Sequence, residues 1–293
     1  MALIKNILVT GSKGQLGSSI QSISDAYRYN FHFKPKDELD ITKSKILRDY
    51  LIRCEINIVI NCAAYTDVVM AEKNNKIANE VNHIAVDNLA KICKDLKIQL
   101  IHISTDYVFD GNKNLPYKES DSPNPINTYG KSKLCGEQSI LKYDLNKSII
   151  IRTSWLFSDY KDNFVSKVLR KLKNSSEVKI VDNEIGSPTN ALDLAKDILE
   201  ILPKINNNKT KIYHYSNEGY CSRFDFALKI SSIIDSSEKI LPVIYFDKNV
   251  RRPKFSALNS SSIIEAFDIK IRKWTESLEE HLNLIKFKYQ NEG

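Results

Sequence analysis

The sequence is poor in the residues that interrupt regular structure, with nine glycines and eight prolines among 293 residues. Long disordered or low-complexity stretches are therefore not expected. It also has no uninterrupted apolar run of about eighteen residues, which argues against a membrane-spanning helix. The amino-terminal stretch MALIKNILVTG lacks the basic start and the cleavage site of a secretory signal. These absences predict a cytoplasmic protein with no membrane partner.

The cysteine content and the distribution of charge argue against further classes of protein. The five cysteines are odd in number and lack the spacing of metal ligands, so we expect reduced thiols. The formal net charge is +7, but the lysines and arginines are spread along the chain rather than gathered in a basic block with aromatic residues. That distribution argues against a nucleic-acid partner. A mild basic excess instead suits a small ligand that carries a diphosphate.

Apolar segments of strand length alternate with helical segments through the first half of the chain. Five strands are expected, at residues 5–10, 30–33, 56–61, 98–104 and 148–154. Between Met70 and Leu96, apolar residues recur every three or four positions, as on one face of a helix. Uniformly apolar strands separated by helices indicate a parallel sheet covered on both faces. The predicted fold class is therefore α/β, a Rossmann-type doubly wound sheet with its ligand crevice at the strand ends.

Gly11, Gly14 and Gly17 follow the first expected strand and open the first expected helix. Glycine lets the backbone approach a pyrophosphate closely, and a helix N-terminus favours negative charge. A glycine triplet alone also fits a simple tight turn, but its place in an alternating chain favours a dinucleotide. No acidic residue ends the second strand, whereas Lys34 and Lys36 stand near its end and suit a 2′-phosphate. We therefore expect NADPH, with NADH as an alternative.

The remainder of the chain is less regular. A further strand at residues 177–181 is expected to return to the sheet, and residues 273–287 to form a final amphipathic helix. We predict an NAD(P)-binding Rossmann domain at residues 1–155. Mixed segments at residues 156–293 are predicted to form a smaller C-terminal substrate-binding lobe. Residues 185–189 and 251–256 are expected on its cleft side, where Arg252 would help to neutralise a diphosphate.

Two stretches, STDYVFDG at residues 104–111 and YGKSK at residues 129–133, carry the candidate chemistry. Tyr129 and Lys133 are four residues apart, so on a helix they project from the same face. A nearby ammonium favours the phenolate and is expected to lower the pKa of Tyr129 from about 10. Tyr129 then suits a general acid for a ketone that becomes an alcohol, and Thr105 can hold the same oxygen. A solvated surface pair is the alternative, and the upstream glycine motif favours chemistry.

Several residues near these two stretches also fit a purely structural role. His102 lies within an apolar strand and is interpreted as a satisfied core residue rather than a catalyst. Trp155 at a strand end also fits core packing. Asp106 also fits the cap of a turn, and Glu72 the cap of a helix.

These segments together resemble the extended short-chain dehydrogenase/reductases and, within them, the dTDP-4-dehydrorhamnose reductases. The resemblance covers nearly the whole chain, through GSKGQLG, DELDIT, NCAAYTDV, STDYVFDG, YGKSKLCGE, RTSWLF, GSPT and a late Arg252-Pro253 segment. Of these, STDYVFDG and RTSW are the most specific. The resemblance implies reduction of the C4 ketone of dTDP-4-dehydro-β-L-rhamnose to dTDP-L-rhamnose, a precursor of bacterial cell-surface polysaccharide.

The resemblance also implies roles for individual residues. The catalytic set would be Thr105, Tyr129 and Lys133. The cofactor-binding set would be Gly11, Gly14, Gln15, Leu16, Gly17, Asp40, Ile41, Ala64, Tyr65, Thr66, Tyr129 and Lys133. The substrate-binding set would be Val68, Thr105, Asp106, Tyr129 and Trp155, to which the charge argument above adds Arg252.

The chain departs from the family pattern at several places. Arg223 stands where the family usually has an aromatic residue, so a local packing change is expected there. Phe255 replaces an asparagine that commonly precedes the late serine, which affects part of the substrate wall. Some members bridge a dimer through magnesium held by glutamates. Ser19 and Leu192 stand at two of those places, so we predict no such metal site.

Other functions fit part of the same pattern. A reductase or an epimerase of another 4-keto nucleotide sugar would share most motifs, and an epimerase would carry tightly held NAD without net oxidation of NADPH. A dehydratase is disfavoured because Thr105 is followed by a single acidic residue. A non-catalytic, reductase-like regulatory subunit is the alternative outside enzymes, and the intact Thr105, Tyr129 and Lys133 argue against it. The expected assembly is a monomer or a homodimer.

Overall fold

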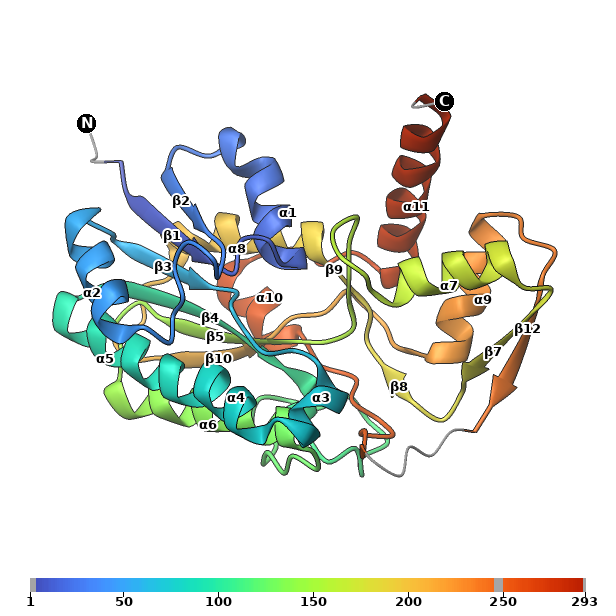
Figure 1. Ribbon diagram of the computed structural model, residues 1–293, viewed down its shortest axis with the longest axis horizontal. Coiled ribbons are helices and arrows are strands. Elements are labelled where there is room, and N and C mark those ends of the chain that lie inside the picture. The colour runs from blue at the N-terminus through green and yellow to red at the C-terminus, as the bar shows by residue number, and fades with distance from the viewer. Residues whose placement is uncertain (1–3, 245–249, 292–293) are drawn as a thin grey trace.

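The centre of the molecule is one parallel sheet of six strands, in the order β10-β5-β4-β3-β1-β2 (Figure 1). It is seen in a computed structural model that describes residues 4–244 and 250–291. The strands are β1 (Asn6–Thr10), β2 (Asn30–Lys34), β3 (Ile58–Asn61), β4 (Gln99–Thr105), β5 (Ile149–Thr153) and β10 (Lys211–His214). The chain moves from β1 to the edge strand β2 and then crosses back to β3. This reversal opens a crevice at the strand ends, and the predicted doubly wound fold is confirmed.

Helices cover both faces of the sheet. One face packs against α1 (Gln15–Ile23), α8 (Ala191–Ile201) and α10 (Ser261–Phe267), the other against α2 (Ser44–Arg53), α5 (Ala85–Leu96) and α6 (Thr128–Tyr143). Within β1, Ile7 and Val9 join the first apolar cluster and Leu8 joins the second, and all three are fully buried. An unbroken apolar run is therefore required, because both sides of the strand lie in a core.

The single helical pattern expected between Met70 and Leu96 is broken into four pieces. They are α3 (Val68–Lys73), α4 (Asn75–Asn79), the π-helical turn η2 (Glu80–Ile84) and α5. In η2, the amide of buried Asn82 donates to the Tyr65 carbonyl at 3.0 Å and accepts from the Tyr65 N–H at 2.8 Å. The π turn thus places a polar side chain where it holds the loop after β3, as π turns often do at functional sites.

A third, smaller apolar cluster forms the core of a lobe, which lies to the right of the sheet in Figure 1. It is built from α7 (Phe164–Asn174), β7 (Glu177–Val181), α9 (Arg223–Ile233), β12 (Lys239–Val243) and α11 (Trp274–Asn291). The strand predicted at residues 177–181 forms, but the prediction that it returns to the central sheet is wrong, because β7 pairs with β12. Only Val178 and Ile180 of β7 are buried, so this strand has one apolar face where the central sheet needs two. The sixth central strand is β10, which the alternation argument did not predict.

Short elements connect the sheet to the lobe. The paired strands are β6 (Leu156–Phe157) with β9 (Thr189–Asn190), and β8 (Ile185–Gly186) with β11 (Cys221–Ser222). Three single 3-10 turns are η1 (Ser24–Ala26), η3 (Asp106–Val108) and η4 (Leu202–Lys204). The chain therefore crosses between the two parts several times after β5, rather than once at a single linker.

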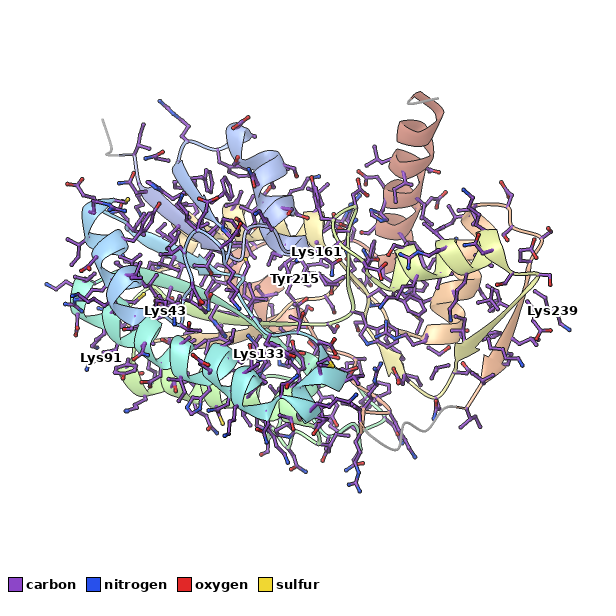
Figure 2. The ribbon with its side chains drawn as sticks, viewed as in Figure 1. Lys43, Lys91, Lys133, Lys161, Tyr215 and Lys239 are labelled. Carbon is purple, nitrogen blue, oxygen red and sulfur yellow. The ribbon has the colours of Figure 1, made fainter. Side chains whose placement is uncertain are left out.

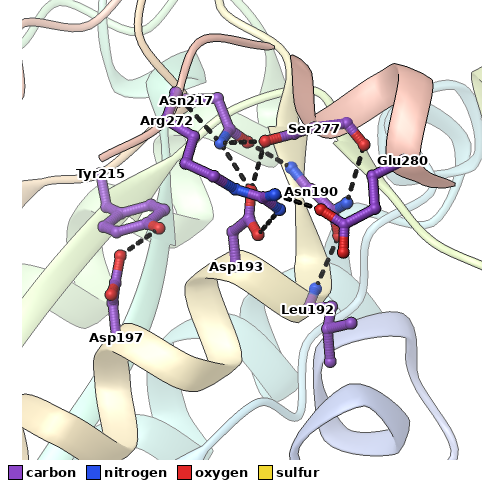
Figure 3. Close-up of polar contacts among 9 residues, drawn as sticks. All are labelled: Asn190, Leu192, Asp193, Asp197, Tyr215, Asn217, Arg272, Ser277 and Glu280. Atoms are coloured by element: carbon purple, nitrogen blue, oxygen red, sulfur yellow. Dashed lines mark hydrogen bonds and ion pairs between the residues drawn. The ribbon is translucent and has the colours of Figure 1, made fainter. Parts of the chain in front are cut away.

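A polar network joins α8 to the start of α11 (Figure 3). The Asn217 amide donates to the Asp193 carboxylate at 2.8 Å and to the Ser277 hydroxyl at 2.9 Å. The Arg272 guanidinium pairs with both Asp193 and Glu280. Since α8 covers the sheet and α11 belongs to the lobe, charged hydrogen bonds tie the two parts together as well as apolar contacts.

The state of the cysteines and the length of the helices bear on two further predictions. All five cysteines are free thiols, as predicted. Across residues 4–244 and 250–291, no helix combines the length and the apolarity that a bilayer crossing requires.

Candidate active site

A cleft of about 660 Å³ opens at the carboxyl ends of the central strands, where the strand order reverses. Such a volume is typical of small-molecule and cofactor sites. The lining includes every residue predicted to bind a cofactor, namely Gly11, Gly14, Gln15, Leu16, Gly17, Asp40, Ile41, Ala64, Tyr65, Thr66, Tyr129 and Lys133. Thr105, Asp106 and Trp155 also line it, whereas the predicted substrate residues Val68 and Arg252 do not.

The glycine loop between β1 and α1 leaves no room for side chains on its inner side. Gly11 has φ +61°, and a Cβ there would lie 2.8 Å from the backbone of Ala63. A Cβ on Gly17 would lie 2.6 Å from Ser12 Cα. Helix α1 begins at Gln15 with no side-chain cap and no acidic residue in its first turn, so its first N–H groups are available to phosphate oxygens. The residues present therefore fit a dinucleotide pyrophosphate.

The loop after β2 brings one of the two expected lysines to the cleft. Lys34 pairs with Glu38 at 2.6 Å and is not part of the cleft lining, whereas Lys36 is. Asp40 also lines the cleft, and its carboxylate accepts hydrogen bonds from the Thr42 N–H at 3.0 Å and hydroxyl at 2.9 Å. Lys36 is therefore the residue of the pair that is placed to meet a 2′-phosphate.

The start of α6 places Tyr129 in the cleft. The side chain of Asn127 caps the helix, and its amide donates to the Arg251 carbonyl at 2.9 Å, so the late segment docks on the same cap. Glu72 of α3 accepts hydrogen bonds at 2.7 Å from both the N–H and the hydroxyl of Thr128. The interpretation of Glu72 as a helix cap is thus confirmed. The helix that it caps is α6, which carries Tyr129.

Burial dominates the electrostatics of Tyr129. It raises the pKa of the phenol well above its ordinary value, and a hydrogen bond with the Thr105 side chain opposes this only in part. The expectation that Lys133 lowers the pKa of Tyr129 is therefore wrong for the chain by itself. The reason is that desolvation of the phenolate outweighs the favourable contacts at this depth.

Lys133 is 1% exposed and engaged with strand β4. Its Nζ donates to the Ile103 carbonyl at 2.6 Å and lies 3.3 Å from Nε2 of His102. Burial lowers the pKa of Lys133 to about 8, against an opposing effect of Glu137. The amine therefore still carries its charge at neutral pH. Figure 2 shows the labelled Lys133 within the sheet-bearing part of the molecule, away from Lys239 at the edge of the lobe.

Asp106 offers a buried acceptor beside Thr105. The Thr105 hydroxyl donates to Asp106 Oδ1 at 3.0 Å, and the Asp106 side chain is almost fully buried. Its other oxygen, Oδ2, accepts no well-formed hydrogen bond within the described part of the chain, although the Ser256 side chain is close enough to lower the pKa of the carboxyl. Burial raises the pKa of Asp106 to about 6. This carboxylate can therefore accept a further hydrogen bond from a donor in the cleft, because a buried acceptor without a full partner is costly.

Trp155 forms a wall of the cleft and is held on two sides. A Cβ on Gly186 would lie 2.4 Å from the Trp155 ring, so glycine allows the close approach. The Arg223 guanidinium lies 3.4 Å from the centre of the same ring and 4.9 Å from that of Phe164. Arg223 also faces Glu184, with Nε 3.8 Å from the carboxylate. The residue that departs from the family pattern therefore places a cation against the Trp155 wall of the cleft.

The second departure, Phe255, lies in a small buried apolar cluster and is not part of the cleft lining. Phe255 is buried with Phe109 and Tyr117, and its ring centre lies 5.5 Å from that of Tyr220. An asparagine at this place would bring a polar amide into that cluster. Phe255 instead closes it with apolar surface.

Several residues of the cleft lining were not predicted from the sequence. They are Lys13, Ser154, Lys161 and Asp162, among others. Lys13 had a signal, because it lies inside the glycine loop. The loop after β6 that carries Lys161 and Asp162 had none, since only the folded lobe brings it to the cleft.

The two positions expected to lack magnesium ligands have no carboxylate. The Ser19 hydroxyl donates to the Gln15 carbonyl at 2.9 Å, within α1. Leu192 is apolar, and its N–H donates to the Asn190 side chain at 2.9 Å (Figure 3). The expected absence of a metal bridge stays a prediction.

A family model described as the RmlD substrate binding domain matches residues 5–287 of the chain. The chain belongs to the dTDP-4-dehydrorhamnose reductase family. The resemblance inferred from the sequence motifs is therefore confirmed. Because the match spans nearly all described residues, both the sheet and the lobe are family features.

Individual relatives agree with this membership. A dTDP-4-dehydrorhamnose reductase from Aggregatibacter actinomycetemcomitans is 36% identical and covers 93% of this chain and 96% of its own. The crystal structure of the reductase from Bacillus anthracis in complex with NADP is 35% identical, with a TM-score of 0.91 over 96% of this chain and 99% of that one. A dTDP-4-keto-6-deoxy-D-glucose reductase from Streptomyces niveus is 31% identical over 95% of this chain and 96% of its own.

Proposed function

We propose that the protein is an NADPH-dependent reductase of the C4 ketone of dTDP-4-dehydro-β-L-rhamnose, forming dTDP-L-rhamnose for cell-surface polysaccharide. The observation that carries the proposal is one cleft that holds Thr105, Tyr129 and Lys133 beside an open glycine loop. The membership of the family and the NADP bound by the Bacillus anthracis relative support the choice of reaction and cofactor.

The residues of the cleft have separate roles in the reduction of the ketone. When bound, NADPH supplies the hydride. Tyr129 gives its proton to the carbonyl oxygen as that oxygen becomes an alkoxide. The Thr105 hydroxyl holds the same oxygen and aligns the ketone, and both groups stabilise the developing charge. The Thr105 hydroxyl has one proton, which it donates to Asp106 in the structure, so it must turn from Asp106 to the ketone oxygen when the substrate binds.

The high pKa of Tyr129 suits the direction of reduction. Because desolvation raises the pKa of Tyr129, the phenol keeps its proton throughout the physiological pH range, and the acid is present when the ketone binds. After proton transfer, the phenolate is left one helical turn from Lys133 on α6. The ammonium then favours the phenolate until the proton is replaced from solvent.

The nucleotide-sugar class is proposed with one specific alternative. The Streptomyces niveus relative is named for a different 4-keto sugar, and Arg223, which departs from the family pattern, packs against Trp155 of the cleft wall. A reductase of another dTDP-linked 4-keto sugar is therefore the second candidate. We further propose a cytoplasmic monomer or homodimer without a nucleic-acid partner, a location supported by the five free thiols.

The test is turnover of a panel of keto-sugar nucleotides by the purified full-length protein. We expect NADPH oxidation with dTDP-4-dehydro-β-L-rhamnose and a product identified by NMR as dTDP-L-rhamnose. Other dTDP- and UDP-linked 4-keto sugars, each with NADPH and NADH, serve as comparisons. Stoichiometric NAD in the purified protein, with no net cofactor oxidation by any sugar, would refute the proposal in favour of an epimerase.

Lys36 is expected to set the preference for NADPH. Replacing Lys36 with alanine removes a charged partner of the 2′-phosphate and should raise KM for NADPH about tenfold. KM for NADH should stay the same, because NADH lacks that phosphate. Steady-state kinetics with both cofactors measures the difference. Lys34→Ala is the matched control, since Lys34 pairs with Glu38 outside the cleft lining, and an equal effect of both variants would contradict the assignment.

Gly186 is expected to control the position of the substrate wall. In Gly186→Ala, the new Cβ would have to displace the Trp155 ring, which Arg223 holds on its face. We expect KM for the sugar nucleotide to rise about tenfold, as overpacking of this kind usually costs. The dissociation constant of NADPH, measured by protein fluorescence, should stay unchanged. A parallel loss of NADPH binding would show instead that the whole cleft is disturbed.

A further inference from the structure

The loop between β6 and α7, residues 158–163, contacts both parts of the molecule. The Ser158 hydroxyl lies 3.0 Å from the side-chain oxygen of Gln15, the first residue of α1. The Asp159 carboxylate lies 3.2 Å from Nδ1 of His281 on α11. Since α1 covers the sheet and α11 belongs to the lobe, this loop bridges the two parts beside the start of α1.

Within this loop, Lys161 has a defined backbone conformation and lines the cleft. Its φ is +57°, in the left-handed region that residues other than glycine rarely adopt. The amide of buried Asn163 donates to the Ser158 carbonyl at 2.8 Å and to the Lys161 carbonyl at 3.1 Å. Such a conformation persists where the surrounding structure holds it. Figure 2 shows the labelled Lys161 between the sheet-bearing part of the molecule and the lobe.

The ammonium of Lys161 makes no ion pair or hydrogen bond with any residue that the structure describes. The neighbouring carboxylate in the cleft lining, Asp162, is already engaged. It accepts a hydrogen bond from Arg170 at 2.6 Å and lies 3.9 Å from Nζ of Lys167. Lys161 therefore brings to the cleft a positive charge that no nearby carboxylate neutralises.

The site for a pyrophosphate lies on the opposite wall, at the glycine loop and the start of α1. A helix N-terminus supplies only about half of a positive charge, whereas each phosphate of a pyrophosphate is negatively charged. Lys13 of the glycine loop already pairs with Asp37 at 2.7 Å. Lys161 is three residues beyond Ser158, which contacts Gln15, and three residues of chain span at most about 10 Å. A cation from the lobe is thus available close to the pyrophosphate site.

We propose that Lys161 is a cofactor-binding residue supplied by the lobe, whose ammonium contacts the pyrophosphate of NADPH across the cleft from the glycine loop. The proposal rests on the cofactor of the proposed function. A nucleotide sugar also carries a diphosphate, but the contact of this loop with Gln15 favours the dinucleotide. Cofactor binding would then involve both parts of the molecule, rather than residues 1–155 alone.

Three variants isolate the charge at this position. Lys161→Gln removes the charge, and Lys161→Arg keeps it. Both substitutes have a Cβ, as lysine does, so the left-handed backbone is equally strained in all three proteins. Lys167→Gln is the matched control, because Lys167 lies outside the cleft lining and its side chain is 60% exposed. Circular dichroism and thermal melting establish that each variant folds.

The readout is the dissociation constant of four ligands, measured by isothermal titration calorimetry without any sugar turnover. In Lys161→Gln the values for NADPH and NADH should both rise about tenfold, because both lose a charged hydrogen bond to the pyrophosphate. The values for adenosine 2′-monophosphate, which has no pyrophosphate, and for dTDP should stay within about twofold. Lys36→Ala should show a different pattern, with weaker binding of NADPH and adenosine 2′-monophosphate and unchanged binding of NADH.

Lys161→Arg and Lys167→Gln should bind both dinucleotides within about twofold of the unmodified protein. Unchanged binding of NADH by Lys161→Gln, or an equal loss in Lys161→Arg or Lys167→Gln, would overturn the proposal. Weaker binding of dTDP alone would overturn it in favour of the diphosphate of the nucleotide sugar. If the unmodified protein binds neither dinucleotide, the cofactor assignment fails and this proposal fails with it. If it binds both but reduces no keto-sugar, only the proposed reaction fails, and the same titrations still decide the role of Lys161.

Discussion

Tyr129→Phe is expected to lower kcat by about 10²- to 10⁴-fold, which is the usual contribution of a positioned general acid. The variant keeps the ring that contacts Tyr107 edge-on, with centroids 5.9 Å apart, and loses only the hydroxyl that bonds to Thr105. The dissociation constant of NADPH should change little, because the glycine loop and the loops after β2 and β3 are untouched. Single-turnover rates of NADPH oxidation measure the chemical step directly.

A control on the same helix makes this result specific. Tyr143 ends α6, and its hydroxyl donates to the Asp87 carboxylate at 3.4 Å, far along the helix from the cleft. Tyr143→Phe should therefore reduce kcat by less than about twofold, as expected of a surface change away from the site. Turnover of Tyr129→Phe at the rate of Tyr143→Phe would remove Tyr129 from the mechanism. Thr105 would then be the remaining donor to examine.

Glu137→Ala is expected to destabilise the protein by about 3–5 kcal/mol, because it leaves a buried guanidinium without its partner. Arg152 and Glu137 are 2% and 1% exposed, and the two side chains are joined by two hydrogen bonds. The Ser104 hydroxyl also donates to Glu137, so a third polar group would lose its acceptor. Urea unfolding, followed by circular dichroism, measures the free energy of unfolding.

An exposed ion pair provides the comparison. Arg48 pairs with Asp95 at 2.9 Å, and the two side chains are 41% and 44% exposed. Arg48→Ala should change the free energy of unfolding by no more than about 1 kcal/mol, since water screens such a pair. A Glu137→Ala protein as stable as Arg48→Ala would mean that water or a rearranged side chain reaches Arg152. The buried pair would then not be the support of β4, β5 and α6 that the structure indicates.

The sequence was sufficient for the features that depend on local order along the chain. Periodicity and residue types close together in the chain predict five of the six central strands and the glycine loop. They also predict that Tyr129 and Lys133 share one face of a helix. These signals are strong because a strand buried on both faces must be apolar throughout, and because residues four apart share a helix face. The family resemblance followed from the same short motifs.

The tertiary structure alone decided which distant groups meet and how deeply they are buried. It assigned the sixth strand to β10 instead of residues 177–181, and it broke the helix after Met70 where Asn82 binds the loop after β3. It set Arg223 against Trp155 and joined His102 to Lys133. The raised pKa of Tyr129 has the same origin. Burial and long-range contact depend on the packing of segments that are far apart in the chain, and no local pattern records them.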